Sequence, residues 1–327
     1  MQMNIAEAIR RGLEEEMRRD DRVVIIGEDV GAAGGIMGVT KGLQAEFGPE
    51  RVVDSPISEL ALGGFGTGAA MAGLRPVVEI MYMDFMPLAL EQLLNQAAQA
   101  RFISAGKLSV PVVFRTQYSL GRHNGPQHSQ FFPSWFANIP GINVVMPSMP
   151  RNAKGLIKQA LRSDRPTLFI EPSLHYFDVT EDVPDEDYVV PFGQAEVHGE
   201  GNELTIVAYS RLVPEALQAA EVLRQEGIGT EVIDPLTARP LDVATIARSV
   251  ARTGRLLIAS DEHRFSSLAS EIAASVYEID FGRLKAPVLR LHPPETHVPT
   301  SPSLEAQYMI DQAKLISAAR SLVGEKS

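Results

Sequence analysis

Apolar residues recur along this chain in two alternating patterns, which predict strands that alternate with helices. Residues 4–20 have apolar positions at helical spacing, with Ile5, Ile9 and Leu13 on one face and Asn4 placed to cap the first turn. The nearly continuous apolar run at 22–31 is typical of a buried parallel strand. Similar runs lie at 51–54, 75–82, 110–116, 142–147 and 166–171, with helical patterns at about 60–73, 86–105 and 151–162.

The second half of the chain repeats this alternation after an irregular segment. Residues 172–190 are rich in Pro and acidic residues, which predicts a linker or a long surface crossing. Strand-like runs follow at 204–209, 229–234, 255–260 and 286–291, with helical patterns at 213–226, 242–251, about 267–278 and from about 303. Alternating strands and helices favour parallel sheets covered on both faces. We therefore predict an α/β protein with two doubly wound domains, residues 1–190 and 191–327.

Composition narrows the possible functions. Of 327 residues 45% are hydrophobic, and the formal net charge is −11. This charge disfavours nucleic acid and anionic membranes as partners, because both attract basic surfaces. The chain has no Cys, which excludes disulfides, thiolate nucleophiles and Cys-based metal sites. Residues 1–21 lack the apolar core of a signal peptide, and no apolar run is long enough to span a membrane. We expect a cytoplasmic protein.

Three polar loops follow predicted strands of the first domain, at the carboxyl edge where ligands bind in doubly wound sheets. They are residues 27–29, 54–59 and 125–130, and they contain Glu28, Glu59 and His128. Each of these side chains has an ordinary structural interpretation as well as a functional one, and the spacing alone does not decide between them.

Glu59 begins a predicted helix whose first turns, LALGGFGTGAAMAG, consist almost wholly of apolar and small residues. One interpretation is an acid at a helix start, where a carboxylate is electrostatically favoured. The functional interpretation is that the small residues allow close approach of a backbone, a cofactor or a neighbouring subunit. Partial desolvation would then favour the protonated carboxyl, which can share a proton with a ring nitrogen.

His128 lies in the polar loop RHNGPQHSQFFPSW, five residues after His123. Two His at this spacing, with no acidic ligand at a fixed distance, make a poor metal motif. A structural or surface His is one interpretation, and a proton or hydrogen-bond donor at a cleft is the other. Glu28 either caps the next turn or orients Glu59 or a ligand.

Several familiar cofactor and nucleophile motifs are missing from the sequence. No G-x-G-x-x-G follows a strand, so a nicotinamide site is not indicated. The chain has no G-x-x-x-x-G-K-[ST] phosphate loop. It also has no G-x-S-x-G, so a serine hydrolase is not indicated.

Several segments together resemble one family. GEDVG, RVVDSPISE, GTGAAMAGLRPVVEI and QHSQ are followed by IPGINVVMPSMPRNAKGLIKQALRSDRP, EVIDPLT, RPLD and TIARSVARTGR. This set, spread over about residues 4–320, is similar to the beta subunit of the decarboxylating component of 2-oxo acid dehydrogenases. The family comprises thiamine-diphosphate-dependent pyruvate, branched-chain 2-oxo acid and acetoin dehydrogenases. The resemblance implies a pyrimidine-binding domain followed by a transketolase-type C-terminal domain.

The resemblance also implies roles for individual residues. Glu59 matches the family glutamate that hydrogen-bonds N1′ of the aminopyrimidine, and His128 matches the histidine that faces the thiazolium. Met81 and Phe85, which the pattern alone would place in a core, match the pyrimidine pocket wall, with Glu28 beside Glu59. Some members bind potassium through backbone carbonyls, and the matching positions are Val112, Ala160, Leu161, Ser163 and Arg165.

The resemblance further implies a partner. Thiamine enzymes hold the diphosphate and Mg²⁺ with a G-D-G motif and a later Asn, and this chain contains no G-D-G. Magnesium requires carboxylate and phosphate oxygens in octahedral order, and we find no candidate loop for it. An alpha subunit is therefore expected to hold that end of the cofactor in an alpha2beta2 heterotetramer.

The resemblance makes oxidative decarboxylation of a small 2-oxo acid, with acyl transfer to a lipoyl domain of an acyltransferase core, the leading hypothesis. Pyruvate is the expected substrate, with acetoin or a branched-chain 2-oxo acid as alternatives. Residues 233–237 lack an Arg that the family usually has, and 261–270 lack its usual Gly-rich stretch. These departures leave open a split transketolase-like enzyme without a lipoyl partner. A non-enzymatic beta-like subunit is disfavoured because Glu59 and His128 are both present.

Overall fold

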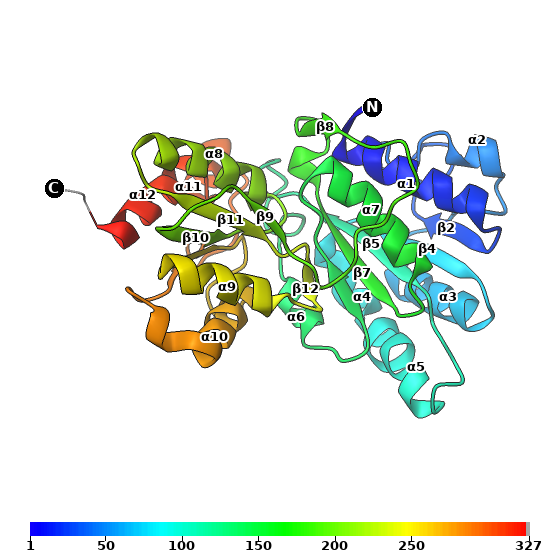
Figure 1. Ribbon diagram of the computed structural model, residues 1–327. Coiled ribbons are helices and arrows are strands. Elements are labelled where there is room, and N and C mark those ends of the chain that lie inside the picture. Colours follow the sequence, from blue (N-terminus) through cyan, green and yellow to red (C-terminus); the bar gives the residue numbers. More distant parts are fainter. Residues whose placement is uncertain (325–327) are drawn as a thin grey trace.

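The computed structural model describes residues 1–324 and contains two α/β units side by side (Figure 1). Residues 325–327, the end of the expected second domain, lie outside the described residues. The N-terminal elements are β1 (Gln2–Asn4), α1 (Ile5–Arg19), β2 (Val23–Gly27), α2 (Leu43–Phe47), β3 (Val52–Asp54), α3 (Glu59–Met71), β4 (Arg75–Ile80), η1 (Met83–Phe85), α4 (Met86–Glu91), η2 (Gln92–Ala97), α5 (Ala98–Ile103), β5 (Val113–Tyr118), α6 (Pro133–Ala137), β6 (Asn143–Val145), α7 (Pro150–Arg162), β7 (Thr167–Pro172), η3 (Ser173–His175) and β8 (Thr180–Asp182).

The C-terminal unit continues the strand and helix alternation. Its elements are β9 (Glu196–His198), β10 (Leu204–Val207), α8 (Leu212–Gln225), β11 (Thr230–Asp234), β12 (Thr237–Arg239), α9 (Val243–Thr253), β13 (Leu256–Ala259), α10 (Leu268–Asp280), η4 (Phe281–Arg283), β14 (Leu289–Leu291), α11 (Pro302–Tyr308) and α12 (Gln312–Val323). In both units the strands alternate with helices, as the hydrophobic pattern predicts.

The N-terminal sheet has seven strands in the order β12-β6-β7-β5-β4-β2-β3. Six of them run parallel, and β12 pairs antiparallel with β6. Successive residues of its strands point to opposite faces, so Ile25 and Val77 belong to one buried cluster and Ile26 and Val78 to another. Helices α1 and α7 cover the first face, and α3, α4 and α5 cover the second (Figure 1).

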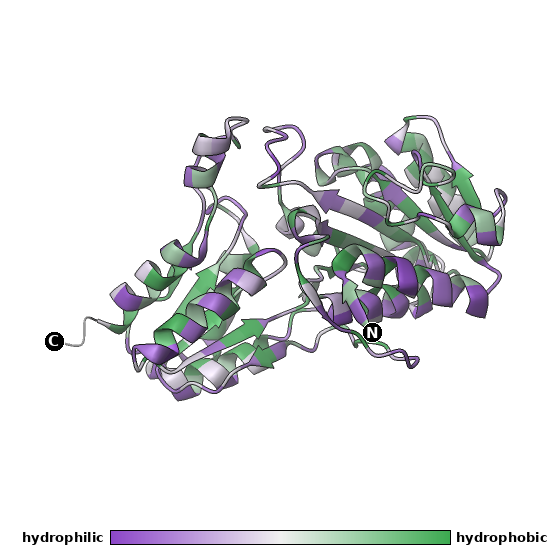
Figure 2. Ribbon diagram, turned by 90° about the horizontal axis from the view of Figure 1, so that it is seen from above, coloured by the Kyte–Doolittle hydropathy of each residue, from purple (hydrophilic) through white to green (hydrophobic). Residues whose placement is uncertain are grey.

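The C-terminal sheet has five strands in the order β14-β13-β10-β11-β9, parallel except for β9. Its apolar strands lie between helical layers that are apolar inward and polar outward (Figure 2). Helices α8 and α12 bury one face in a separate cluster. Helices α9 and α10 bury the other face in the cluster that continues under α3 and α4 of the first unit. One of the three apolar clusters therefore runs through both units.

The start of α1 follows from its sequence. The Asn4 side chain accepts a hydrogen bond from Glu7 N at 2.9 Å, and the Glu7 carboxylate accepts one from Asn4 N at 3.0 Å. This reciprocal pair is a capping box, so the predicted N-cap is confirmed.

Three sequence predictions need correction. Residues 172–190 are not simply a linker, because Tyr176 is fully buried and β8 pairs with β1. The predicted helix at 86–105 contains a π-helical segment, Gln92–Ala97, between two α-helices. The predicted helix from about 303 is two helices, because residues 309–311 interrupt it. In addition, β12 adds to the N-terminal sheet although it follows the expected boundary at 190.

Candidate active site at the strand ends of the N-terminal sheet

The predicted site residues follow the carboxyl ends of four neighbouring strands. The sheet order places β3, β2, β4 and β5 side by side and parallel, so their carboxyl ends share one edge. Glu28 comes directly after β2 and Met81 directly after β4, while the loops after β3 and β5 lead to Glu59 and His128. Side chains from distant parts of the sequence therefore gather at the edge where such sheets bind ligands.

Glu59 is the first residue of α3 and is half-buried in this chain. Ser58 provides no side-chain cap, so free N–H groups at the helix start favour a negative charge there. The small residues that follow have a packing role. A Cβ on Gly66 would overlap Val78 of β4, and one on Gly63 would lie 3.1 Å from Ala89 Cβ. Close packing of α3 against β4 and α4 therefore fixes the position of the helix start that carries the Glu59 carboxyl.

Glu28 and Glu59 interact electrostatically across the ends of β2 and β3. Burial raises the pKa of the Glu28 carboxyl, and the nearby charges of Asp29 and Glu59 raise it further. The two loops are tied together, because Asp54 Oδ1 accepts a hydrogen bond from Gly31 N at 2.7 Å. The structure therefore places the Glu28 and Glu59 carboxyls close enough to interact electrostatically.

His128 is half-buried and lies against two aromatic rings from the segment after β4. Its ring centroid is 4.9 Å from that of Tyr82 and 5.4 Å from that of Phe85, each in an edge-to-face arrangement. The two aromatic rings also contact one another edge-to-face, at 5.9 Å. Such contacts restrict the imidazole's orientation. Phe85 therefore contacts a predicted site residue, and Met81 is half-buried at the end of β4.

Sequence reasoning missed two residues of this segment. Tyr82 contacts His128, and Asp84 holds the chain just beyond it: Asp84 Oδ1 accepts a hydrogen bond from Gln130 Nε2 at 2.9 Å. Burial raises the pKa of Asp84, and its other oxygen, Oδ2, is buried without a protein partner. The signal available was the composition of MYMDF, where a tyrosine and an acid interrupt an apolar run directly after a strand.

In this arrangement the carbonyls at all five expected potassium positions already accept hydrogen bonds within the chain. The carbonyls of Leu161 and Ser163 each accept a hydrogen bond from Arg75 Nη1 at 2.9 Å, so a guanidinium already occupies the space between them. The remaining three carbonyls also accept hydrogen bonds within the chain: Val112 from Thr167 N, Ala160 from Ser163 N and Arg165 from the Thr167 hydroxyl. Potassium would have to displace Arg75.

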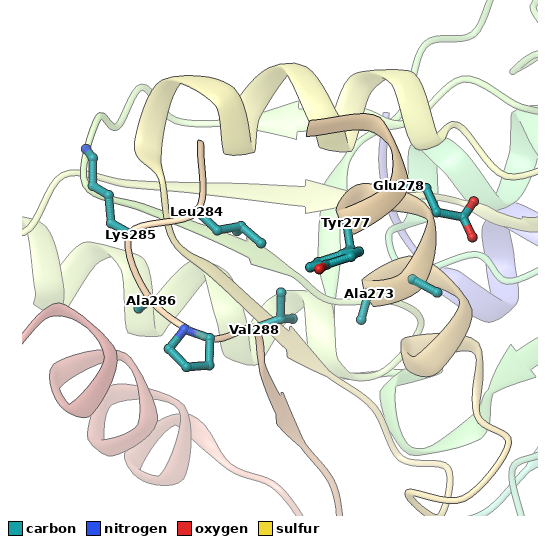
Figure 3. Close-up of a pocket in the computed structure, with 9 residues that line it drawn as sticks. Ala273, Tyr277, Glu278, Leu284, Lys285, Ala286 and Val288 are labelled. Atoms are coloured by element: carbon teal, nitrogen blue, oxygen red, sulfur yellow. The ribbon is translucent and has the colours of Figure 1, made fainter. Parts of the chain in front are cut away.

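Two further features lie outside this edge. Arg115 of β5 is buried between the carboxylates of Glu79 and Glu171, an internal ion-pair network. In the C-terminal unit, α10 and the chain before β14 form an apolar groove of about 740 Å³. Figure 3 shows Tyr277, Leu284 and Val288 around this groove. None of the predicted site residues lines it.

Metal ligands and membrane spans are absent from the described part of the chain. Residues 1–324 contain no group of three or more His, Asp or Glu side chains placed to hold a metal ion. None of the helices within these residues combines the length and the apolar character needed to cross a bilayer.

Comparison with protein-family models identifies both units. Residues 1–177 match the transketolase pyrimidine-binding domain, and residues 193–315 match the transketolase C-terminal domain. A solved structure described as a split-gene transketolase, an inactive beta4 tetramer, superposes with a TM-score of 0.82 over 98% of both chains at 20% identity. The fold is therefore transketolase-like, and the predicted fold class is confirmed.

Curated relatives define the family more closely. The 2-oxoisovalerate dehydrogenase subunit beta of Bacillus subtilis is 41% identical over 98% of both chains. The acetoin:2,6-dichlorophenolindophenol oxidoreductase subunit beta of Cupriavidus necator is 40% identical over 97% of this chain and 96% of its own. The mitochondrial pyruvate dehydrogenase E1 component subunit beta-2 of Oryza sativa is 40% identical over 98% and 86%. The chain belongs to the family of 2-oxo acid dehydrogenase E1 beta subunits, which confirms the predicted resemblance.

Proposed function

We propose that this chain is the beta subunit of a thiamine-diphosphate-dependent 2-oxo acid dehydrogenase and is active only with an alpha subunit. The observation that carries the proposal is the gathering of Glu28, Glu59 and His128 at the carboxyl edge of a sheet that matches a pyrimidine-binding domain. The donor set suits an aminopyrimidine, because a half-buried carboxyl lies at a helix start, where it can hydrogen-bond a ring nitrogen.

Glu59 is the proposed acid–base residue. Its carboxyl would hydrogen-bond the ring nitrogen N1′ and hold the proton there, and its charge is among those that raise the pKa of Glu28. Met81 and Phe85 would form the apolar wall that excludes water from the ring. When bound, thiamine diphosphate supplies the electron sink for loss of CO₂ from the 2-oxo acid.

His128 is the proposed hydrogen-bond or proton donor toward the reacting substrate. Tyr82 and Phe85 both contact the His128 ring edge-to-face, so the orientation of the imidazole is restricted. A restricted ring lowers the entropy that is lost when substrate and donor align.

An alpha subunit is the proposed holder of the diphosphate and Mg²⁺. This chain has no G-D-G motif, and residues 1–324 offer no cluster of carboxylates for a metal ion. Magnesium at a diphosphate requires such oxygens. The names of the curated relatives describe beta subunits, which supports an alpha2beta2 assembly for this chain as well.

The proposed substrate is a small 2-oxo acid, with pyruvate first and the acyl group passed to a lipoyl domain. Relatives named for 2-oxoisovalerate, acetoin and pyruvate are 40–41% identical to this chain. Identity at this level favours none of the three, so pyruvate is proposed on its prevalence in the family.

The test is a turnover assay on the alpha–beta pair purified together. Pyruvate, 3-methyl-2-oxobutanoate and acetoin are offered in turn with thiamine diphosphate, Mg²⁺ and an artificial electron acceptor. We expect cofactor-dependent turnover of at least one, with the 2-oxo acid preferred and acyl transfer to added lipoyl domain. No turnover of any of them would contradict the proposal, and aldehyde or acyloin release without lipoyl transfer would indicate a transketolase-like reaction.

A further inference from the structure

We propose that Glu305, on α11 of the C-terminal unit, is a positioning residue for His128. It holds the loop after β5 that carries His128 at the site. This inference rests on the role proposed above for His128. It assigns to the C-terminal unit a direct part in shaping the active edge of the N-terminal sheet.

The Glu305 carboxylate is fully buried, and its bonding partners all belong to this one loop. Gly121 N donates a hydrogen bond to Oε1 at 2.8 Å, and His123 N donates one to Oε2 at 2.9 Å. The His123 ring nitrogen Nδ1 lies 2.6 Å from Oε2. Hydrogen bonds to an ionised acceptor are stronger than neutral ones, and two backbone donors fix the direction of the chain.

The loop has a backbone shape that needs such support. Gly121, His123 and Gly125 have φ of 93°, 62° and 73°, all in the left-handed region. A non-glycine residue there is strained and persists only where surrounding contacts hold it. The flanks of α11 supply further contacts: a Cβ on Gly125 would lie 2.6 Å from Thr300 Oγ1, and one on Gly121 would lie 2.9 Å from Met309 Cε.

His128 lies between two anchors of the same loop. On one side Glu305 holds the chain, and His128 N donates a 3.4 Å hydrogen bond to the carbonyl of Gly125. On the other side Gln130 is tied to Asp84 through both its backbone N–H and its side chain. If the Glu305 anchor is lost, the chain before His128 loses its hydrogen bonds to α11, and the position of the imidazole against Tyr82 and Phe85 is less restricted.

The experiment compares Glu305→Gln, His128→Ala and the double variant in the purified alpha–beta pair, with Glu295→Gln as a matched control at an exposed Glu of the C-terminal unit. Glu305→Gln keeps the size of the side chain but replaces one carboxylate oxygen by an amide that cannot accept. We expect kcat to fall about 10-fold with KM within about two-fold, because misplacing a reacting group costs rate rather than binding. In the His128→Ala background the same change should cost less than about two-fold.

The inference is tested by whether the losses in kcat caused by Glu305→Gln and His128→Ala depend on one another. Full additivity of the two losses, or wild-type kcat for Glu305→Gln, would overturn it. If the wild-type pair turns over no 2-oxo acid, the proposed function fails instead, so the two failures are distinguishable. Glu295→Gln should leave the rate unchanged.

A second measurement does not depend on turnover. In Glu305→Gln, hydrogen exchange of the Gly121 and His123 amides should accelerate at least about 10-fold, because their buried acceptor is weakened. The variant His123→Asn removes the ring contact but tolerates positive φ, so it should change exchange and kcat by less than about three-fold. Unchanged exchange in Glu305→Gln would overturn the inference even if the rate fell.

Discussion

The two helical layers on the N-terminal sheet are built differently. On one face α1 and α7 are held together by charges within the chain: Glu15 pairs with the buried Lys158 at 2.5 Å and with the buried Lys154 at 3.0 Å. On the other face α3 to α5 leave large apolar side chains in water, with Phe65 58% exposed and Phe102 90% exposed. The charges between α1 and α7 are paired within the chain, whereas α3, α4 and α5 leave apolar side chains exposed. We call α1 and α7 the closed layer, and α3, α4 and α5 the open layer.

The difference matches where the chemistry lies. Glu59 begins the open layer, whereas none of the residues proposed to contact the pyrimidine or the substrate lies on α1 or α7. Contiguous exposed apolar side chains mark surfaces that other proteins cover. We propose that the closed layer is the structural side of the domain and that the open layer, which begins at Glu59 and carries the exposed Phe65, is the side that meets another subunit.

The largest expected effect is on the closed layer. Lys158→Met leaves a carboxylate less compensated between α1 and α7, and breaking a buried ion pair from one side costs about 3 kcal/mol. Denaturant unfolding of the chain should show this loss, while turnover by the assembled pair at low temperature stays near wild type. The exposed Lys107→Met is the control and should change stability by less than about 0.5 kcal/mol. An equal loss for both variants would contradict the comparison.

On the open layer the expected effect is on rate. Glu59→Gln should lower turnover at least about 100-fold, equivalent to about 2.7 kcal/mol of barrier, because an amide cannot hold the proton at the ring nitrogen. Steady-state assays of the pair measure it, with the exposed Glu50→Gln as control. Wild-type turnover in Glu59→Gln would favour a beta-like subunit without a catalytic role.

The next effect is on binding of the alpha subunit, which should depend on the open layer. Phe65→Ser removes an exposed ring from α3, so the free energy of unfolding of the isolated chain should change by less than about 0.5 kcal/mol. Binding to the alpha subunit should weaken about 10-fold, since exposed aromatic residues at contacts carry much of the binding energy. Calorimetric titration with the alpha subunit measures the affinity of the wild-type chain and that of Phe65→Ser. Unaltered affinity would place the contact elsewhere.

The closed layer also predicts a pH dependence. Burial alone would raise the pKa of Glu15, but hydrogen bonds from Lys158 and Lys154 together hold it below its ordinary value. A lowered folded-state pKa contributes stability above the ordinary Glu value of 4.5, and this stability is lost as pH falls through the folded-state pKa. Wild type should therefore lose more stability than Lys158→Met between pH 5 and 3, by up to about 1 kcal/mol. If the free energy of unfolding of wild type and of Lys158→Met fell equally over this pH range, the prediction would be wrong.

The smallest expected effect is that of potassium. Because Arg75 already donates to the carbonyls of Leu161 and Ser163, replacing K⁺ by Na⁺ at equal ionic strength should leave Tm within about 1 °C. A clear K⁺-dependent rise in Tm would show that the ion displaces the guanidinium.

The sequence predicted the features that depend on local pattern. Apolar runs predicted most strands, and the Gly-rich stretch after Glu59 predicted a helix that begins at that acid, as α3 does. Parallel strands then imply a shared edge, so the placement of Glu28, Glu59 and His128 in segments that follow the strands at that edge could be expected from topology.

Contacts between distant residues could not be predicted in this way. Glu305 is 182 residues from His123 and 184 from Gly121, and no local pattern links an acid on a short helix to a loop so far away. The same holds for Arg75, whose carbonyl partners lie 86 and 88 residues later, and for β12, which returns to the first sheet. The contacts of Glu305 and β12 depend on how the two units pack, and those of Arg75 on how α7 packs against the N-terminal sheet.

The most direct test of the account is cofactor binding measured by calorimetry with Mg²⁺ and thiamine diphosphate. We expect no measurable binding to this chain alone and saturable binding once the alpha subunit is added, weakened in the pair that carries Glu59→Gln. Tight, magnesium-dependent binding of the cofactor by the isolated chain would contradict it.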